Sequence, residues 1–234
     1  MNDLTPAVVR SLSHVTDWVF DLDNTLYPRT CNLFAQIDVR ITQYVMDLTR
    51  LDFAGARELQ KSYYRDYGTT LNGLMQRHKV DPDHFLTTVH AIDYTPVDAH
   101  PDLVDAIRSL PGRKFILTNG DTGHARSVLR RLGGDELFEH VHDIRAMTFV
   151  PKPHREAYDG FFATYGIDPN SAVMFDDLEK NLVVPHEVGM STVQVVASDD
   201  FQHEQVEAWE LGRATGPHVH HVTDNLAQFL RQLP

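Results

Sequence analysis

Residues 18–22 are apolar except for Asp21, and Asp23 follows directly, so two carboxylates stand two positions apart. The segment predicts a buried strand that ends at these residues. Two carboxylates crowded at a strand end repel each other, so the arrangement is costly unless a cation or a reaction uses them. An ordinary Asp-Asn turn before Thr25 would also explain the pattern. The rest of the chain must therefore decide between a turn and a site.

Two different patterns follow this stretch. From about residue 30 to 100, apolar residues recur at helical spacing with no strong strand signal, which predicts a helical bundle. From about residue 101, predicted helices alternate with short apolar strands, and such alternation gives a parallel sheet covered on both faces. We predict an α/β fold with a Rossmann-like parallel-sheet core and an inserted helical cap domain after the first strand. The expected boundaries are 1–29 and 100–234 for the core and 30–99 for the cap.

Charge and composition exclude several classes of partner. The formal net charge of −12 argues against a nucleic-acid polymer or an anionic membrane as the main partner. No apolar run is long enough to span a bilayer, and residues 1–16 lack the apolar block of a secretory signal. The single cysteine, Cys31, permits no internal disulfide and fits a reducing compartment. We expect a cytoplasmic monomer or homodimer.

Polar residues follow three of the predicted strands. Ligands of open parallel sheets bind outside the carboxyl ends of the strands, so these clusters should meet at one edge. The clusters are Asp21-Leu22-Asp23, Thr118-Asn119-Gly120 and Asp176-Asp177. Four carboxylates at one edge require a cation, and their oxygens suit Mg²⁺. With Lys152, held between two prolines, the set predicts a phosphate held between a metal and donors, with a carboxylate as the attacking group.

At this point the chain resembles the haloacid dehalogenase-like hydrolase superfamily, which carries four motifs in this order. They appear here, over residues 19–181, as Asp21-Leu22-Asp23-Asn24-Thr25, Thr118-Asn119-Gly120, Lys152, and Asp176-Asp177-Leu178-Glu179-Lys180-Asn181. More narrowly, the chain is similar to the pyrimidine 5'-nucleotidase-like branch. That closer resemblance rests on segments 20–28, 63–74 and 90–94.

The resemblance implies a mechanism for the two acids of the first motif. Asp21 attacks phosphorus and forms an aspartyl-phosphate, which water then hydrolyses. Asp23 protonates the leaving alkoxide and later takes a proton from the water, and a general acid of this kind typically contributes about 10²–10⁴-fold. Neighbouring carboxylates should raise the pKa of Asp23 and keep it protonated until it is needed. Transport ATPases of this type carry threonine where Asp23 stands, and dehalogenases lack this acid, so Asp23 favours phosphatase or phosphomutase chemistry.

The resemblance also assigns roles to the remaining motif residues. Catalysis is assigned to Asp21, Asp23 and Lys152. Phosphate binding is assigned to Thr118, Asn119, Gly120 and Lys152. Mg²⁺ binding is assigned to Asp21, the backbone oxygen of Asp23, and Asp177, with Asp176 either a further ligand or a residue behind the ligands. Orienting roles are assigned to Thr25 and Asn181.

The expected cap should close over the site and select the substrate, because lids exclude water and complete pockets. Tyr64, Arg65 and Arg77 are the candidates to face the substrate, and an aromatic ring could stack on a base. The predicted function is a Mg²⁺-dependent phosphatase for nucleoside 5'-monophosphates, with pyrimidine nucleotides preferred. One alternative is a phosphatase of another small phosphorylated metabolite, or a phosphomutase. A third is a catalytically silent binding protein with this fold.

Overall fold

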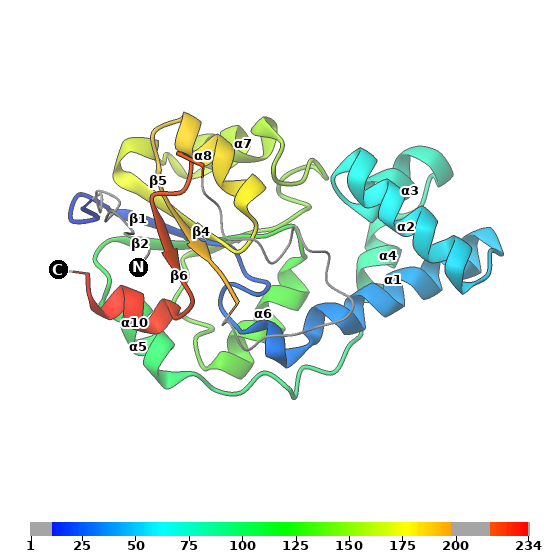
Figure 1. Ribbon diagram of the computed structural model, residues 1–234, viewed down its shortest axis with the longest axis horizontal. Helices are drawn as coiled ribbons and strands as arrows, with labels where there is room; N and C mark the ends of the chain where they lie inside the picture. Colours follow the sequence, from blue (N-terminus) through cyan, green and yellow to red (C-terminus); the bar gives the residue numbers. More distant parts are fainter. Residues whose placement is uncertain (1–10, 198–215, 234) are drawn as a thin grey trace, which may run out of the picture.

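The computed structural model describes residues 11–197 and 216–233 (Figure 1). Within these ranges, six parallel strands form one sheet in the order β3-β2-β1-β4-β5-β6. The strands are β1 (Asp17–Phe20), β2 (Arg113–Leu117), β3 (His140–His142), β4 (Ala172–Asp176), β5 (Ser191–Val195) and β6 (His221–Thr223). The predicted parallel α/β core is thereby confirmed.

Strand β1 lies in the middle of the sheet and is buried on both faces. Phe20 is in register with Ile116 of β2 and Phe175 of β4. Because side chains alternate along a strand, Phe20 packs into one hydrophobic core and Val19 into the other. The strand is shorter than the predicted apolar stretch, since pairing ends at Phe20.

Helices cover both faces of the sheet. Helices α5 (Pro101–Ser109), α6 (Thr122–Leu132) and α10 (Leu226–Arg231) contribute to the core on the Phe20 face, and α7 (Arg155–Tyr165) and α8 (Val183–Glu187) to the core on the Val19 face. Figure 1 shows the two groups on opposite sides of the sheet. Three short 3₁₀ helices complete this part: η1 (Arg29–Cys31), η2 (Pro169–Ser171) and η3 (Glu179–Leu182).

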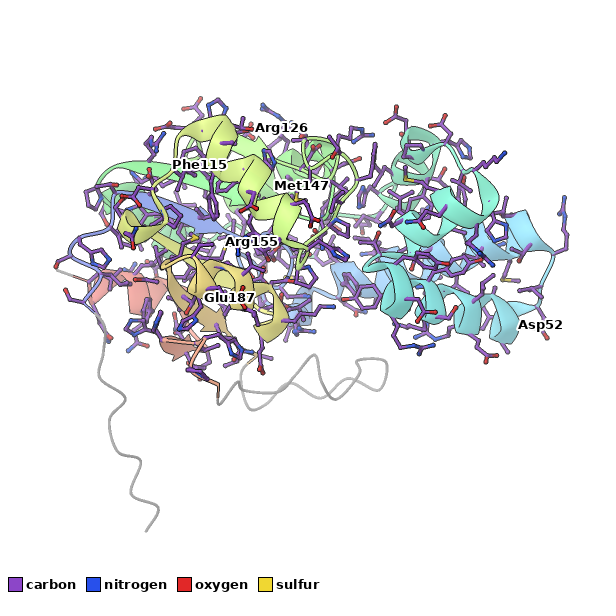
Figure 2. All side chains as sticks on the ribbon, turned by 90° about the horizontal axis from the view of Figure 1, so that it is seen from above. Asp52, Phe115, Arg126, Met147, Arg155 and Glu187 are labelled. Atoms are coloured by element: carbon purple, nitrogen blue, oxygen red, sulfur yellow. The ribbon has the colours of Figure 1, made fainter. Side chains whose placement is uncertain are left out.

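Four helices between β1 and α5 stand to one side of the sheet (Figure 1). They are α1 (Leu33–Thr49), α2 (Phe53–Tyr67), α3 (Thr70–His78) and α4 (Pro82–Val89). Figure 2 shows Asp52, at the start of α2, at the end of the molecule remote from Phe115 of the sheet. Asp81 accepts a hydrogen bond from the backbone N–H of Asp83 at the start of α4, and Pro82 takes the first position of that helix. The helical character of this region agrees with the prediction, and its status as a separate cap domain stays a prediction.

Asp38 joins α1 to α2 through a buried polar network. Its carboxylate accepts hydrogen bonds from Arg57 at 2.5 Å and from Gln60 at 2.7 Å, and Gln60 in turn accepts one from Thr42. Asp38 and Gln60 are 6% and 3% exposed, so their polar groups depend on each other rather than on water.

Replacing Asp38 by alanine should lower the free energy of unfolding by about 2–3 kcal/mol, because Gln60 and Arg57 lose a charged acceptor. Urea unfolding followed by circular dichroism measures this. Asp47→Ala, at an exposed position of the same helix, is the matched control and should change stability by less than about 0.5 kcal/mol. Equal effects of the two substitutions would contradict the network's role.

In the described ranges no helix combines the length and apolar character that a membrane crossing needs. The cytoplasmic location and the monomeric or homodimeric state stay predictions.

Candidate active site

The predicted motif residues meet at the carboxyl edge of the central strands. Asp21 follows β1, Thr118 follows β2, and Asp176 ends β4. The backbone N–H of Asp21 still donates to the carbonyl of Phe175 at 2.8 Å, which ties the end of β1 to β4. The carboxylates at the predicted strand ends are therefore neighbours in the structure, as the parallel sheet led us to expect.

Lys152 is the central cation of this edge. Its Nζ donates to Asp21 Oδ1 and to Asp176 Oδ2, both at 2.7 Å, and its side chain is 1% exposed. Burial alone would lower the pKa of Lys152, but the two carboxylates raise it, so the ammonium stays charged. Lys152 therefore lies between the carboxylates of Asp176 and of Asp21, the predicted nucleophile.

Asp21, Asp176 and Asp177 each offer a carboxylate oxygen within 4.8 Å of the others, which is a fitting donor set for a hard divalent cation. Asp176 has little capacity left, because Oδ1 accepts from the Leu178 backbone and from Asn181, and Oδ2 accepts from Lys152. Asp177 Oδ2 instead accepts from Arg29 at 2.5 Å.

The protein's own cations do not fully balance these carboxylates. Burial raises the pKa of Asp21 to about 7, despite the opposing charge of Lys152. Burial and the nearby Asp176 raise the pKa of Asp177 well above its usual value, although Arg29 opposes the shift. A cation bound at this cluster would hold both carboxylates ionised. Their raised pKa values therefore agree with a cation-binding role for the cluster.

Asp23 lies in a different environment from Asp21. Its Oδ1 accepts a hydrogen bond from the Tyr27 hydroxyl at 2.5 Å and lies 2.7 Å from His124 Nε2. Burial alone would raise the pKa of Asp23, but His124 and Tyr27 lower it to about 2. The expectation that neighbouring carboxylates raise this pKa is wrong, because the side chains that contact the Asp23 carboxylate are His124 and Tyr27 rather than another carboxylate.

The Thr118-Asn119-Gly120 segment is braced by its own side chains. Thr118 Oγ1 accepts from the Gly120 N–H at 2.9 Å. The Asn119 side chain accepts from the Lys152 N–H at 2.8 Å and donates to the Lys152 carbonyl at 3.1 Å. The Asn119 side chain therefore holds the backbone of Lys152 in place.

A cavity opens above the carboxylates, between the sheet edge and helices α1–α4. Most residues of its floor are charged or polar, and most residues of its wall are apolar or aromatic. The floor includes Asp21, Asp23, Arg29, Thr118, Asn119, Gly120, Lys152, Asp177 and Asn181. The wall from α1–α4 and the turn before α3 is formed by Phe34, Ile37, Ile41, Tyr64, Thr69, Thr70, Leu71, Phe85, Leu86 and Val89.

Of the three residues expected to face the substrate, only Tyr64 is among those lining this cavity. Its hydroxyl accepts from Lys180 Nζ at 3.0 Å, which connects α2 to the loop after β4. Arg65 is 73% exposed and lies 3.5 Å from Asp66, and Arg77 is exposed on the last turn of α3. The structure therefore does not bring Arg65 and Arg77 to this cavity.

The orienting residues also differ. Asn181 donates to Asp176 and its carbonyl accepts from Tyr158, as suits a residue that holds the loop in place. Thr25 is buried, and its Oγ1 has no hydrogen-bond partner in the described part of the chain. An orienting hydrogen bond from the Thr25 side chain is thus not found.

Sequence reasoning missed Arg29, His124 and His90, which line or support the site. Arg29 begins η1 and His124 lies in the first turn of α6, and neither residue belongs to a motif quoted above. A helix beginning at the carboxyl edge of a parallel sheet was the available signal, since its first turn points to that edge.

Comparison with protein families supplies the deciding observation: residues 19–182 match the haloacid dehalogenase-like hydrolase model. The chain belongs to this family of hydrolases. It is also similar to phosphate metabolism protein 8 of Saccharomyces cerevisiae, with 25% identity over an alignment of 202 residues, and the match covers 79% of this chain. The chain spans 62% of the length of that yeast relative.

Solved structures agree on the fold. L-2-haloacid dehalogenase from Xanthobacter autotrophicus has a TM-score of 0.57 at 16% identity, covering 93% of this chain and 97% of that one. A haloacid dehalogenase-like phosphatase from Thermococcus onnurineus has the same TM-score at 15% identity, with the same coverage. Enzymes with different leaving groups thus share this hydrolase fold, so the reaction must be argued from the site.

Proposed function

We propose that this hydrolase is a Mg²⁺-dependent phosphatase that works through an aspartyl-phosphate on Asp21. The observation that carries the proposal is the position of Asp21, which lines the cavity, contacts Lys152 at 2.7 Å and belongs to the carboxylate cluster. A nucleophile there would attack a phosphoryl group beside two positive charges, the Lys152 ammonium and a metal ion held by the carboxylate cluster.

Asp23 separates phosphatase from dehalogenase chemistry. A halide is a weak base and leaves without a proton, whereas an alkoxide needs an acid as its bond to phosphorus breaks. Asp23 lines the cavity two residues after Asp21, which supports the leaving-group role. Because His124 and Tyr27 lower its pKa, Asp23 is ionised in the free protein, and it must take up a proton as the anionic substrate binds beside it. In the first half-reaction an Asp21 oxygen then bonds to phosphorus as the bond from phosphorus to the leaving oxygen breaks, and that oxygen takes the Asp23 proton. In the second, water attacks phosphorus, Asp23 takes its proton, and Asp21 is released.

The metal assignment rests on the available oxygens. Asp21, Asp177 and the backbone oxygen of Asp23 would hold Mg²⁺, and a bound Mg²⁺ supplies positive charge to the phosphoryl oxygens. Asp176, whose two oxygens already accept hydrogen bonds from Leu178, Asn181 and Lys152, would instead hold the lysine. Asn181 would keep Asp176 in that orientation.

We further propose nucleoside 5'-monophosphates, with pyrimidine preference, as substrates. The described wall residues within α1–α4 and the turn before α3 carry no formal charge, which fits a neutral leaving group better than one with a second phosphate, and His90, directly after α4, also lines the cavity. Three aromatic residues, Phe34, Tyr64 and Phe85, line the cavity and supply apolar surface for a base, and Lys180 Nζ lies over the Tyr64 ring, 4.5 Å from its centroid. Another small phosphomonoester, a phosphomutase reaction and a silent binding protein remain the alternatives to be tested.

A panel of phosphorylated metabolites, assayed by phosphate release in Mg²⁺, tests the proposal. UMP and CMP should be hydrolysed with a kcat/KM at least about tenfold above that for UDP, because the wall residues within α1–α4 offer no positive charge to a second phosphate. Release from a sugar phosphate but not from nucleotides would favour the other metabolite, and transfer without release a phosphomutase. No release from any compound would favour a binding protein.

A further inference from the structure

Two buried side chains hold a single oxygen of Asp23. The hydroxyl of Tyr27, which is 2% exposed, and Nε2 of His124, which is 1% exposed, both contact Oδ1. Within the described ranges Oδ2 makes no hydrogen bond, and it lies 3.7 Å from the point where a Cβ on Gly120 would stand. Oδ2 is therefore the Asp23 oxygen that lies beside the Thr118-Asn119-Gly120 segment.

His124 is itself held in one orientation. Tyr94 donates its single hydroxyl proton to the His90 carbonyl at 3.1 Å, so at 3.0 Å from His124 the Tyr94 oxygen accepts from Nδ1–H. The imidazole also stacks on His90, with ring centroids 4.6 Å apart. Its backbone N–H donates to Asp121 at 2.7 Å, which fixes the start of α6. The ring therefore cannot turn without breaking several contacts.

We propose that His124 is a positioning residue for Asp23. With Tyr27 it clamps Oδ1, so that Oδ2 faces the leaving oxygen of the substrate. As the bond between phosphorus and that oxygen breaks, the Oδ2–H bond breaks too, its proton passes to the leaving oxygen, and its electron pair stays on Oδ2. His124 keeps its own proton throughout. This inference rests on the proposed phosphatase function and adds a residue outside the four motifs.

Two substitutions of His124 separate positioning from general support of the fold. In His124→Gln, the amide nitrogen can stand near the former Nε2 and still donate to Asp23. In His124→Asn, the shorter amide can reach Tyr94 but not Asp23. The two variants are similar in polarity and differ mainly in which neighbour they reach.

The readout is the dependence of kcat/KM on the leaving group, measured with phenyl phosphate and 2,4-dinitrophenyl phosphate. The kcat/KM value reports steps up to the loss of the phenolate, and only the basic phenolate needs an acid. We expect His124→Asn to reduce kcat/KM for phenyl phosphate at least about tenfold more than for the dinitrophenyl ester. His124→Gln should show a smaller difference between the two esters.

Equal losses with both esters would overturn the inference, because a merely structural role lowers them together. If His124→Asn does not fold, Tyr27→Phe removes the second clamp and takes the same test, with the same selective loss expected and the same overturning result. Wild type without activity on either ester would defeat the proposed function itself. Selective loss in Asp23→Asn together with equal losses in the clamp variants would defeat the inference alone.

Discussion

Asp21→Asn is expected to reduce phosphate release from p-nitrophenyl phosphate in Mg²⁺ by at least about 10⁴-fold, because removing a catalytic nucleophile costs on this scale. The amide keeps the shape of the side chain but cannot attack phosphorus. Because the proposed nucleophile acts in the chemical step, the loss should appear in kcat and not only in KM.

Asp105→Asn is the matched control for this prediction. Asp105 has a side chain that is 68% exposed on α5, away from the carboxyl edge, and its replacement should leave the rate unchanged. Circular dichroism of both variants establishes that they fold. Near wild-type hydrolysis by Asp21→Asn would rule out the aspartyl-phosphate mechanism.

Lys152→Met should lower the free energy of unfolding by about 3–5 kcal/mol and also abolish hydrolysis. Asp21 and Asp176 would then face each other, buried, without the ammonium that now contacts both at 2.7 Å, and breaking such a buried pair is strongly destabilising. Urea unfolding measures the change. Added Mg²⁺ should recover part of the loss, and it should stabilise this variant more than wild type.

Two further variants test the cause of that loss. Lys79→Met, at an exposed position after α3, should change stability by less than about 0.5 kcal/mol. Adding Asp176→Asn to Lys152→Met removes one of the opposed charges and should restore stability, so the two substitutions should be clearly non-additive. A loss below about 1 kcal/mol for Lys152→Met would show that the lysine does not hold the carboxylates together.

The sheet and the motif positions could be predicted because their signals are local. Apolar strands alternating with helices dictate a parallel sheet, and the ends of such strands share one edge, so Asp21, Thr118 and Asp176 could be placed together without coordinates. Four helices after β1 were likewise visible in their periodicity.

Contacts between remote segments could not be predicted in this way. His124 reaches Asp23 across 101 positions, and Arg29 reaches Asp177 across 148. The predicted direction of the Asp23 pKa shift was wrong for this reason, since the imidazole that decides it is distant in sequence. Arg65 lies away from the cavity for a different reason. Successive side chains of a helix are rotated by about 100°, so Arg65 points away from the cavity that Tyr64 lines.

The chain leaves the sheet at its central strand, and this has an evolutionary consequence. The carboxylates and the lysine come from the ends of strands and the loops beside them, while the wall of the cavity comes from helices inserted after β1. Substitutions in those helices can alter which molecule fits without shifting the register of β1 against its neighbours. Rate and selectivity can therefore diversify separately, and relatives with the same reacting groups can acquire new substrates through changes in α1–α4.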